Sequence, residues 1–248
     1  MANYKLVLEY DGTNYHGFQI QPNGITIQGC LESALSQIAK EPVRVIAAGR
    51  TDAGVHALYQ VVNFHSNLSV PLAKLPIAIN SLLPEDIRVK QAAIVSDQFH
   101  ARYDAIAKTY CYYIQQGPVA SVFHRHYCWH IKAELNWDNI LQAGKKFEGV
   151  HDFRAFAASG SNVKSTVRNL IEFHLQVQDN WAELRFTANG FLYNMVRNMV
   201  GTLVEVGLGK RVPESIPAIL ASKERAYAGV TAPAAGLFLT MVYYPDNA

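Results

Sequence analysis

The order of secondary-structure elements expected in the first hundred residues restricts the fold more than any other feature. Strand-like patterns occur at 4–10, 43–49, 58–65 and 87–95. Helix patterns fill the two gaps, at 27–40 and at 71–84, where Pro71 suits a first turn and Pro76 is expected to kink the helix. The resulting β-α-β-β-α-β order is typical of ferredoxin-like folds.

The rest of the chain repeats these ingredients less regularly. Strands are expected at 107–115, 123–131, 168–178, 181–188 and 236–244. Helices are expected at 135–148, 192–206 and 213–222. Antiparallel strands with helices on one face predict an α+β protein. We therefore expect two related ferredoxin-like halves, residues 1–105 and 106–248, with an active-site cleft between them.

Composition limits the class of protein. Half of the 248 residues are hydrophobic and 17% are charged, which predicts a substantial core and excludes disorder. The apolar runs are too short to span a membrane, and the first residues lack the pattern of a signal peptide. Cys30, Cys111 and Cys128 are widely spaced and are expected to be reduced thiols in a cytoplasmic protein.

Local charge is more informative than the formal net charge of +2, which neither requires nor excludes a nucleic-acid partner. Basic residues gather in one part of the sequence, at Lys145, Lys146, Lys164 and Arg168. They could neutralise RNA phosphates if the fold brings them to one groove. Solvated lysines on unrelated surfaces would give the same pattern.

The segment GRTDAGVH, residues 49–56, lies between two expected strands. Its glycines permit a positive φ and the close approach of another chain, and they enclose one acid, Asp52, and one cation, Arg50. A tight turn in which Asp52 bonds its own backbone is the simpler interpretation. The pairing of acid and cation within nearly side-chain-free backbone favours a site for a bulky ligand.

Two further segments carry side chains that could do chemistry. In AKTYCYYI, residues 107–114, Tyr110 and Tyr112 share one strand face, where they could pack in the core or stack on a nucleic-acid base. In HRHYCWH, residues 124–130, three histidines and Cys128 would share a strand face. Because that stretch extends over roughly 20 Å, one metal ion cannot reach all four side chains. We expect an exposed strand face there.

Several common catalytic signatures do not occur in the sequence. It contains no GxxxxGK[ST], no GxGxxG that opens a helix, no GxSxG and no HExxH. Asp52 is the single acid of its loop, whereas glycosidase chemistry would need two facing carboxylates.

Six segments together resemble one family. They are YDGTNYHGFQIQPNGITIQ, AGRTDAGVHALYQVVNF, FHARYDAIAKTYCYYI, HDFRAFAASGSNVKSTVRN, NGFLYNMVRNMVGTLVEVGLG and RAYAGVTAPAAGLFLTMVYYP. In this order, over residues 9–245, the chain is similar to the tRNA pseudouridine synthase A family. That resemblance implies isomerisation of uridine to pseudouridine at positions 38, 39 and 40 of the anticodon stem-loop. It also implies a homodimer that needs no cofactor or metal.

The resemblance assigns roles to individual residues. Asp52 matches the essential aspartate, Tyr110 the active-site tyrosine, and Arg197 a basic residue that pairs with the aspartate. Arg197 also lies off the apolar stripe of its expected helix. Arg50 matches an arginine that enters the space left by a flipped base. Whether Asp52 adds to the ribose C1′ or assists removal of the C2′ proton stays open.

The first matching segment also implies substrate contacts by Phe18, Gln19 and Gln28. Phe18 stands where the family usually has tryptophan, and it keeps an aromatic plate. Two other functions compete with the synthase. A non-catalytic RNA-binding protein of two RRM-like halves would leave Asp52 without a role, and the usual RRM aromatic run is missing. A metal-dependent hydrolase would depend on the histidines of 124–130.

Overall fold

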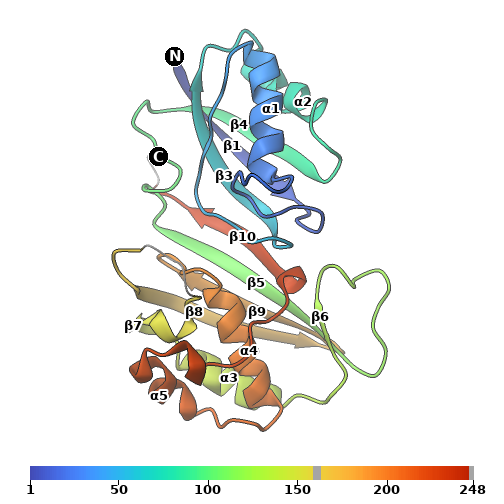
Figure 1. Cartoon of the computed structure of the whole chain (residues 1–248), viewed down its shortest axis with the longest axis vertical. Helices are drawn as coiled ribbons and strands as arrows, with labels where there is room; N and C mark the ends of the chain where they lie inside the picture. Colours follow the sequence, from blue (N-terminus) through green and yellow to red (C-terminus); the bar gives the residue numbers. More distant parts are fainter. Residues whose placement is uncertain (159–162, 246–248) are drawn as a thin grey trace. The chain divides into compact units, whose positions relative to one another are not determined.

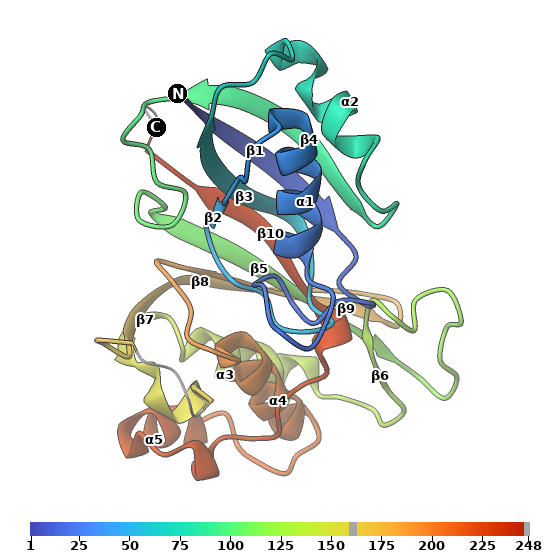
Figure 2. The ribbon, with the colours of Figure 1, turned by 45° about the horizontal axis from the view of Figure 1, so that its top comes forward.

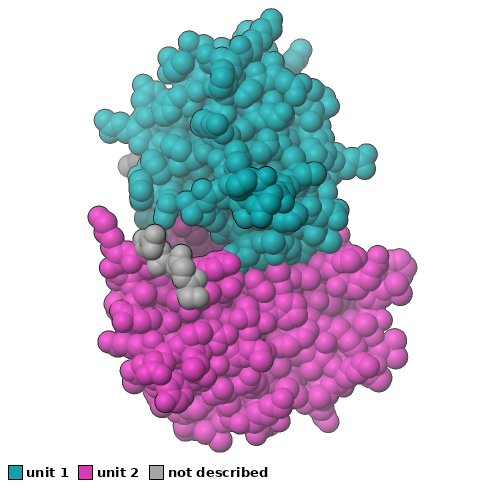
Figure 3. Space-filling view, in the orientation of Figure 1, with its two compact units in different colours: residues 1–106, 238–248 teal, residues 107–237 magenta. Residues whose placement is uncertain are grey.

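The computed structural model describes residues 1–158 and 163–245 (Figure 1), so residues 159–162 of the fourth matching segment lie outside it. The chain divides into two compact units (Figure 3). Unit 1 contains residues 1–106 together with the chain from Phe238 on, and unit 2 contains residues 107–237. Both units combine antiparallel strands with helices, which confirms the predicted α+β class.

Unit 1 has the β-α-β-β-α-β order of elements along the chain that the sequence predicts. Its first four strands are β1 (Ala2–Tyr10), β2 (Ile46–Ala47), β3 (His56–Ser66) and β4 (Ile87–Val95). They pair antiparallel in the order β4-β1-β3, and β2 pairs with β3. The helices α1 (Ile27–Ala39) and α2 (Leu75–Asn80) lie on one face of this sheet (Figures 1 and 2). This is the ferredoxin-like arrangement expected for the first half.

Local sequence explains where the helices of unit 1 begin and end. The Thr26 hydroxyl caps α1 by accepting from the Gly29 amide, and the buried Ile27, Leu31 and Leu35 face the sheet. The expected kinked helix over 71–84 is instead a short 3-10 turn, Leu72–Lys74, followed by α2. Pro76 lies in the first turn of α2, where no amide donor is needed.

Unit 2 also combines strands, most of them antiparallel, with α-helices. Its strands are β5 (Ala107–Gln116), β6 (Trp129–Ile131), β7 (Gly149–Asp152), β8 (Val167–Gln178) and β9 (Trp181–Ala188). Its helices are α3 (Trp137–Lys145), α4 (Met195–Gly207) and α5 (Ser215–Ser222). The strand order is β5-β9-β8-β7, with β6 parallel to β5, and α3 packs against α4 and β8 (Figure 2).

The last strand departs from the expected division of the chain. β10 (Leu237–Tyr243) pairs in parallel with β3 through Phe238 and Leu239, and the chain from Phe238 on is therefore grouped with unit 1. The sequence pattern predicts this strand as part of the second half, residues 106–248. A pairing between segments about 180 residues apart leaves no local signal in the sequence.

The expected strand over 123–131 is wrong for most of its length. Turns occupy 122–127, and only Trp129–Ile131 forms a strand. The Cys128 thiol donates to the His124 carbonyl, and the His130 ring contacts the Gly117 carbonyl at 2.8 Å. The alternation of histidine and cysteine therefore does not form one strand face. The short β7 was missed, since four residues give too little periodicity.

Candidate active site

The GRTDAGVH segment forms a tight loop that enters β3. Gly54 has a φ of +76°, and the Val55 amide donates to the Asp52 carbonyl at 3.1 Å, which closes a turn. Arg50 is exposed and Asp52 is half-buried. The loop therefore presents a cation and an acid from a backbone that is locally closed.

A second loop, residues 11–18, lies directly against this one. The Phe18 amide donates to the Thr51 carbonyl at 3.0 Å. Gly17 has a φ of +86°, and a Cβ on it would lie 2.7 Å from the same carbonyl oxygen. No other residue fits at this position without moving one of the two backbones. We call residues 11–18 and 49–56 together the double loop.

His56 ties the two parts of the double loop together. Its Nδ1 lies 3.0 Å from an Asp11 carboxylate oxygen and 3.1 Å from the Gly12 amide nitrogen, and its ring stacks on Phe238. The Gly12 amide can donate only to an unprotonated Nδ1, whereas the Asp11 contact needs a proton on it. In either state His56 joins the end of GRTDAGVH to the start of the other loop.

Buried polar groups support the loop from below. The Tyr10 hydroxyl lies 2.8 Å from the Thr51 hydroxyl, and the Gln60 amide donates to the Gly49 carbonyl at 2.9 Å. Burial raises the pKa of Tyr10 to about 12. Sequence reasoning missed this group. The one available signal was a glutamine within the apolar alternation of LYQVVNF.

In unit 2, Tyr110 and Tyr112 belong to β5 and have different surroundings. Tyr110 is 8% exposed, and its ring meets Phe191 edge-on with centroids 5.0 Å apart. Tyr112 is fully buried, and its hydroxyl donates to the Pro233 carbonyl at 2.8 Å. Burial raises the pKa of Tyr112, and the charge of Arg197 opposes that increase. Tyr112 is thus a core residue.

Arg197 is fixed in the first turn of α4. Its Nε donates to the Ala232 carbonyl at 2.8 Å and its Nη1 donates to Asn194 Oδ1 at 3.1 Å. The Ala232 amide in turn donates to the Arg197 carbonyl at 3.1 Å. The guanidinium is half-buried, so its direction is set by the segment that contains Ala232.

Comparison with known proteins identifies the family. A family model described as tRNA pseudouridine synthase matches residues 6–104 and 143–245. A protein of Thermoanaerobacter sp. (strain X514) named tRNA pseudouridine synthase A is 48% identical over 98% of this chain and 100% of its own. The chain belongs to the tRNA pseudouridine synthase family.

Other relatives agree with this family. Proteins named tRNA pseudouridine synthase A from Acetivibrio thermocellus and Bacillus subtilis (strain 168) are 46% and 43% identical, each over 98% of this chain. They are themselves covered over 100% and 99% of their lengths. A solved Cbf5–Nop10–Gar1 complex is a distant match that covers 96% of this chain and 59% of that chain. Its TM-score of 0.37 and identity of 13% are too low to support an argument.

The synthase places the three residues expected to contact substrate in different surroundings. Gln19, which directly follows residues 11–18 of the double loop, is exposed. The Gln28 amide oxygen accepts from the Ile20 amide at 3.2 Å, so Gln28 holds that chain segment in place. Phe18 is 1% exposed and lies 6.3 Å from the Tyr10 ring. Phe18 therefore packs beneath the loop in this structure, and its contact with a substrate stays a prediction.

The four basic residues expected to contact RNA phosphates lie in two separate parts of unit 2. Lys145 and Lys146 are at the end of α3, and Lys145 forms a 2.8 Å ion pair with Glu148. Lys164 is exposed just before β8. Arg168, within β8, donates to the carbonyls of Ser165 and Val167. Because the Lys145 charge is already paired with Glu148, it is less available to an RNA phosphate.

Residues 1–158 and 163–245 contain neither a metal-ligand cluster nor a membrane-spanning helix. No group of three or more histidine, cysteine, aspartate or glutamate side chains in these ranges could hold a metal ion. Within the same residues, every helix falls short of the length and hydropathy that crossing a bilayer requires.

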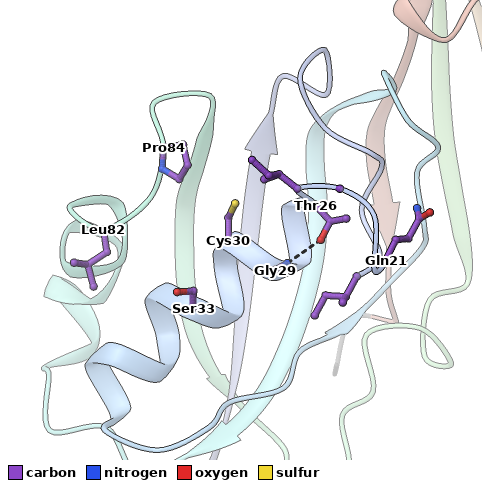
Figure 4. A pocket seen from close by; sticks show the side chains of 10 residues that line it. Gln21, Thr26, Gly29, Cys30, Ser33, Leu82 and Pro84 are labelled. Atoms are coloured by element: carbon purple, nitrogen blue, oxygen red, sulfur yellow. Dashed lines mark hydrogen bonds between the residues drawn. The ribbon is translucent and has the colours of Figure 1, made fainter.

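An open hollow of about 440 Å³ lies beside the start of α1, and Asp52 is not among its lining residues (Figure 4). Its lining includes Gln21, Thr26, Cys30, Ser33, Leu82 and Pro84. Burial raises the pKa of the Cys30 thiol, and the charge of Asp86 adds to this effect. A thiol that stays protonated is a poor nucleophile. The hollow therefore offers no reactive group, and the double loop remains the candidate active site.

Proposed function

We propose that Asp52 is the catalytic carboxylate with which this tRNA pseudouridine synthase isomerises uridine at positions 38, 39 and 40 of the anticodon stem-loop. The observation that supports this assignment is the double loop, which holds a half-buried acid and an exposed arginine on a doubly anchored backbone. Groups held rigidly by a scaffold suit catalysis, because their geometry is set before the substrate arrives.

The reaction explains the choice of side chains. Pseudouridine forms when the N1–C1′ bond breaks, the uracil turns, and C5 bonds to C1′; C5 then loses its proton and N1 takes one up, so that the product is an isomer of uridine. The target nucleotide must first leave its stack. The Asp52 carboxylate either adds to C1′ as the uracil departs or assists removal of the C2′ proton. It must be ionised in both cases, and we assign Arg197 as the cation that favours this form.

Arg50 acts in the flipping step in this proposal. Its exposed guanidinium can stack in the space that the flipped base leaves and can pair with a phosphate. We expect Arg50→Ala to reduce turnover by about 100-fold, because the RNA with the flipped base loses the guanidinium that fills the vacated space. Single-turnover assays on tRNA would measure this. Arg102→Ala, which removes another exposed arginine of unit 1, is the control. Equal rates for both variants would exclude the role.

Tyr110 retains the detached uracil. Its ring can stack on the base, and its hydroxyl can take part in the proton transfer at C5. Tyr110→Phe separates the two contributions, because it keeps the ring and removes the hydroxyl. We expect a fall of about 100-fold in the single-turnover rate if the hydroxyl transfers the proton. A change below about threefold would leave stacking as the only contribution.

The decisive experiment for the proposed function uses the purified protein and tRNA transcripts. We expect pseudouridine at positions 38–40, also when a chelator is present. Binding without product would favour a non-catalytic RNA-binding protein, and loss of product with the chelator would favour a metal-dependent enzyme.

We further infer a cytoplasmic homodimer from the family resemblance. Light scattering at the assay concentration tests the dimer, and a monomeric mass would contradict it.

A further inference from the structure

The loop that carries Asp52 is held by two polar side chains from outside it, Tyr10 and Gln60, and by the hydroxyl of its own Thr51. Gln60 is fully buried, and Tyr10 and Thr51 are 4% and 6% exposed. The Gln60 amide donates to the Gly49 carbonyl at 2.9 Å and to the Tyr10 hydroxyl at 3.4 Å. The Tyr10 hydroxyl reaches the Thr51 hydroxyl at 2.8 Å. These contacts therefore hold the residue before Arg50 and the residue after it.

The direction of one hydrogen bond follows from the groups involved. The amide nitrogen of Gln60 can only donate, so the Tyr10 oxygen accepts from it. Either hydroxyl can be the donor between Tyr10 and Thr51, and Tyr10 has its proton available for this bond. The raised pKa of Tyr10, about 12, keeps that proton in place at neutral pH. The pairing of β1 with β3 shifts its register between Leu8 and Tyr10, and this shift sets the position of the Tyr10 hydroxyl in the hydrogen-bond network.

A polar support beneath a loop has a cost that an apolar one lacks. Buried polar groups must all be hydrogen-bonded, and in residues 1–158 and 163–245 no buried side-chain nitrogen or oxygen lacks a partner. Apolar side chains could fill the same space without that requirement. What hydrogen bonds add is direction, because they fix which way each carbonyl and hydroxyl of the loop points.

We propose that Tyr10 and Gln60 are positioning residues, whose hydrogen bonds to Gly49 and Thr51 hold Arg50 and Asp52 in the geometry that turnover requires. This inference rests on the proposed function of Asp52. Because both side chains are buried, they act through the loop and not on the tRNA. Substrate affinity then depends on them little, whereas the chemical step depends on them strongly.

The test compares two buried tyrosines of the same strand. Tyr10→Phe should lower kcat by about 10- to 100-fold with KM for tRNA changed by less than about twofold, because small displacements of reacting groups slow chemistry severely. Tyr4→Phe is the matched control. Tyr4 is 6% exposed and stacks on Phe64 in β3. Assays are run well below the thermal midpoints of both variants, so that the folded fraction is equal.

Further variants test the hydrogen bond itself. Thr51→Val should lower kcat to a similar extent, and Thr51→Ser, which keeps the hydroxyl, should restore most of it. The double variant Tyr10→Phe, Thr51→Val should lower kcat little further than either single variant does, because both changes remove the same Tyr10–Thr51 hydrogen bond. Gln60→Met keeps the side-chain length and should also lower kcat with KM unchanged.

The outcomes separate this inference from the proposed function. A kcat of Tyr10→Phe within about twofold of that of Tyr4→Phe, with Asp52→Asn inactive, overturns the positioning role and leaves Asp52 as the catalytic acid. A rise in KM with kcat unchanged also overturns it, since it would show a role in binding. If Asp52→Asn remains active, the proposed function fails and the inference fails with it.

Discussion

Asp52→Asn is expected to slow pseudouridine formation by about 1,000-fold or more. An amide can neither add to C1′ as a carboxylate does nor take the C2′ proton, so both routes left open for Asp52 are lost. The loop itself should persist, because backbone groups of Thr51 and Asp52 and the hydroxyl of Thr51 anchor it. The affinity for tRNA should therefore change by less than about threefold.

Two measurements on one tRNA transcript check this expectation. Single-turnover kinetics gives the chemical rate, and a filter-binding titration gives the dissociation constant. Asp97→Asn removes another carboxylate of unit 1, one that is exposed, and should leave both quantities unchanged. Rapid turnover by Asp52→Asn would move the catalytic role to another residue. Loss of tRNA affinity together with the rate would instead show that Asp52 acts mainly in binding.

The fold was predictable from the sequence where elements are long and local. The apolar spacing of Ile27, Leu31 and Leu35 predicts α1, and the alternation in β4 gives its bounds without error. Two kinds of error have physical causes. The alternation of His124–His130 imitates a strand although turns occupy 122–127. The parallel pairing of β10 with β3 joins residues far apart in the chain, and local patterns carry no record of it.

The candidate site was predictable only for the residues that would touch substrate. The pattern around Asp52 is visible because glycines and charges stand together in GRTDAGVH. Its support is not visible, because Tyr10 and Gln60 meet the loop through contacts between segments about 40 and 10 residues apart. An aromatic residue beside a functional loop also suggests stacking on a base. In the structure Phe18 packs inside unit 1, and its contact with a substrate stays a prediction.

Gly201→Ala is expected to have the largest effect on stability. Gly201 lies in α4, and a Cβ on it would lie 1.7 Å from the Val230 carbonyl oxygen. Neither the helix nor the segment 229–232 can yield easily, because the Gly229 amide donates to Thr202 Oγ1 at 2.8 Å and the Val230 amide to Glu205 at 3.1 Å. We expect a loss of about 3 kcal/mol of unfolding free energy, and a thermal midpoint lower by about 10 °C.

The same substitution should also slow turnover at temperatures at which the protein remains folded. The segment displaced by the new methyl group carries Ala232, whose carbonyl orients the Arg197 guanidinium and whose amide bonds the Arg197 carbonyl.

Gly190→Ala is the control, because its Cβ would meet only Arg168 at ordinary contact distances of 3.5 and 3.7 Å. Calorimetry and single-turnover kinetics measure the two effects separately. A destabilised Gly201→Ala protein with full activity at low temperature would show that the 229–232 segment supports the fold of unit 2 but not the orientation of Arg197. Full stability would mean that α4 and this segment can separate without cost, contrary to the contacts that join them.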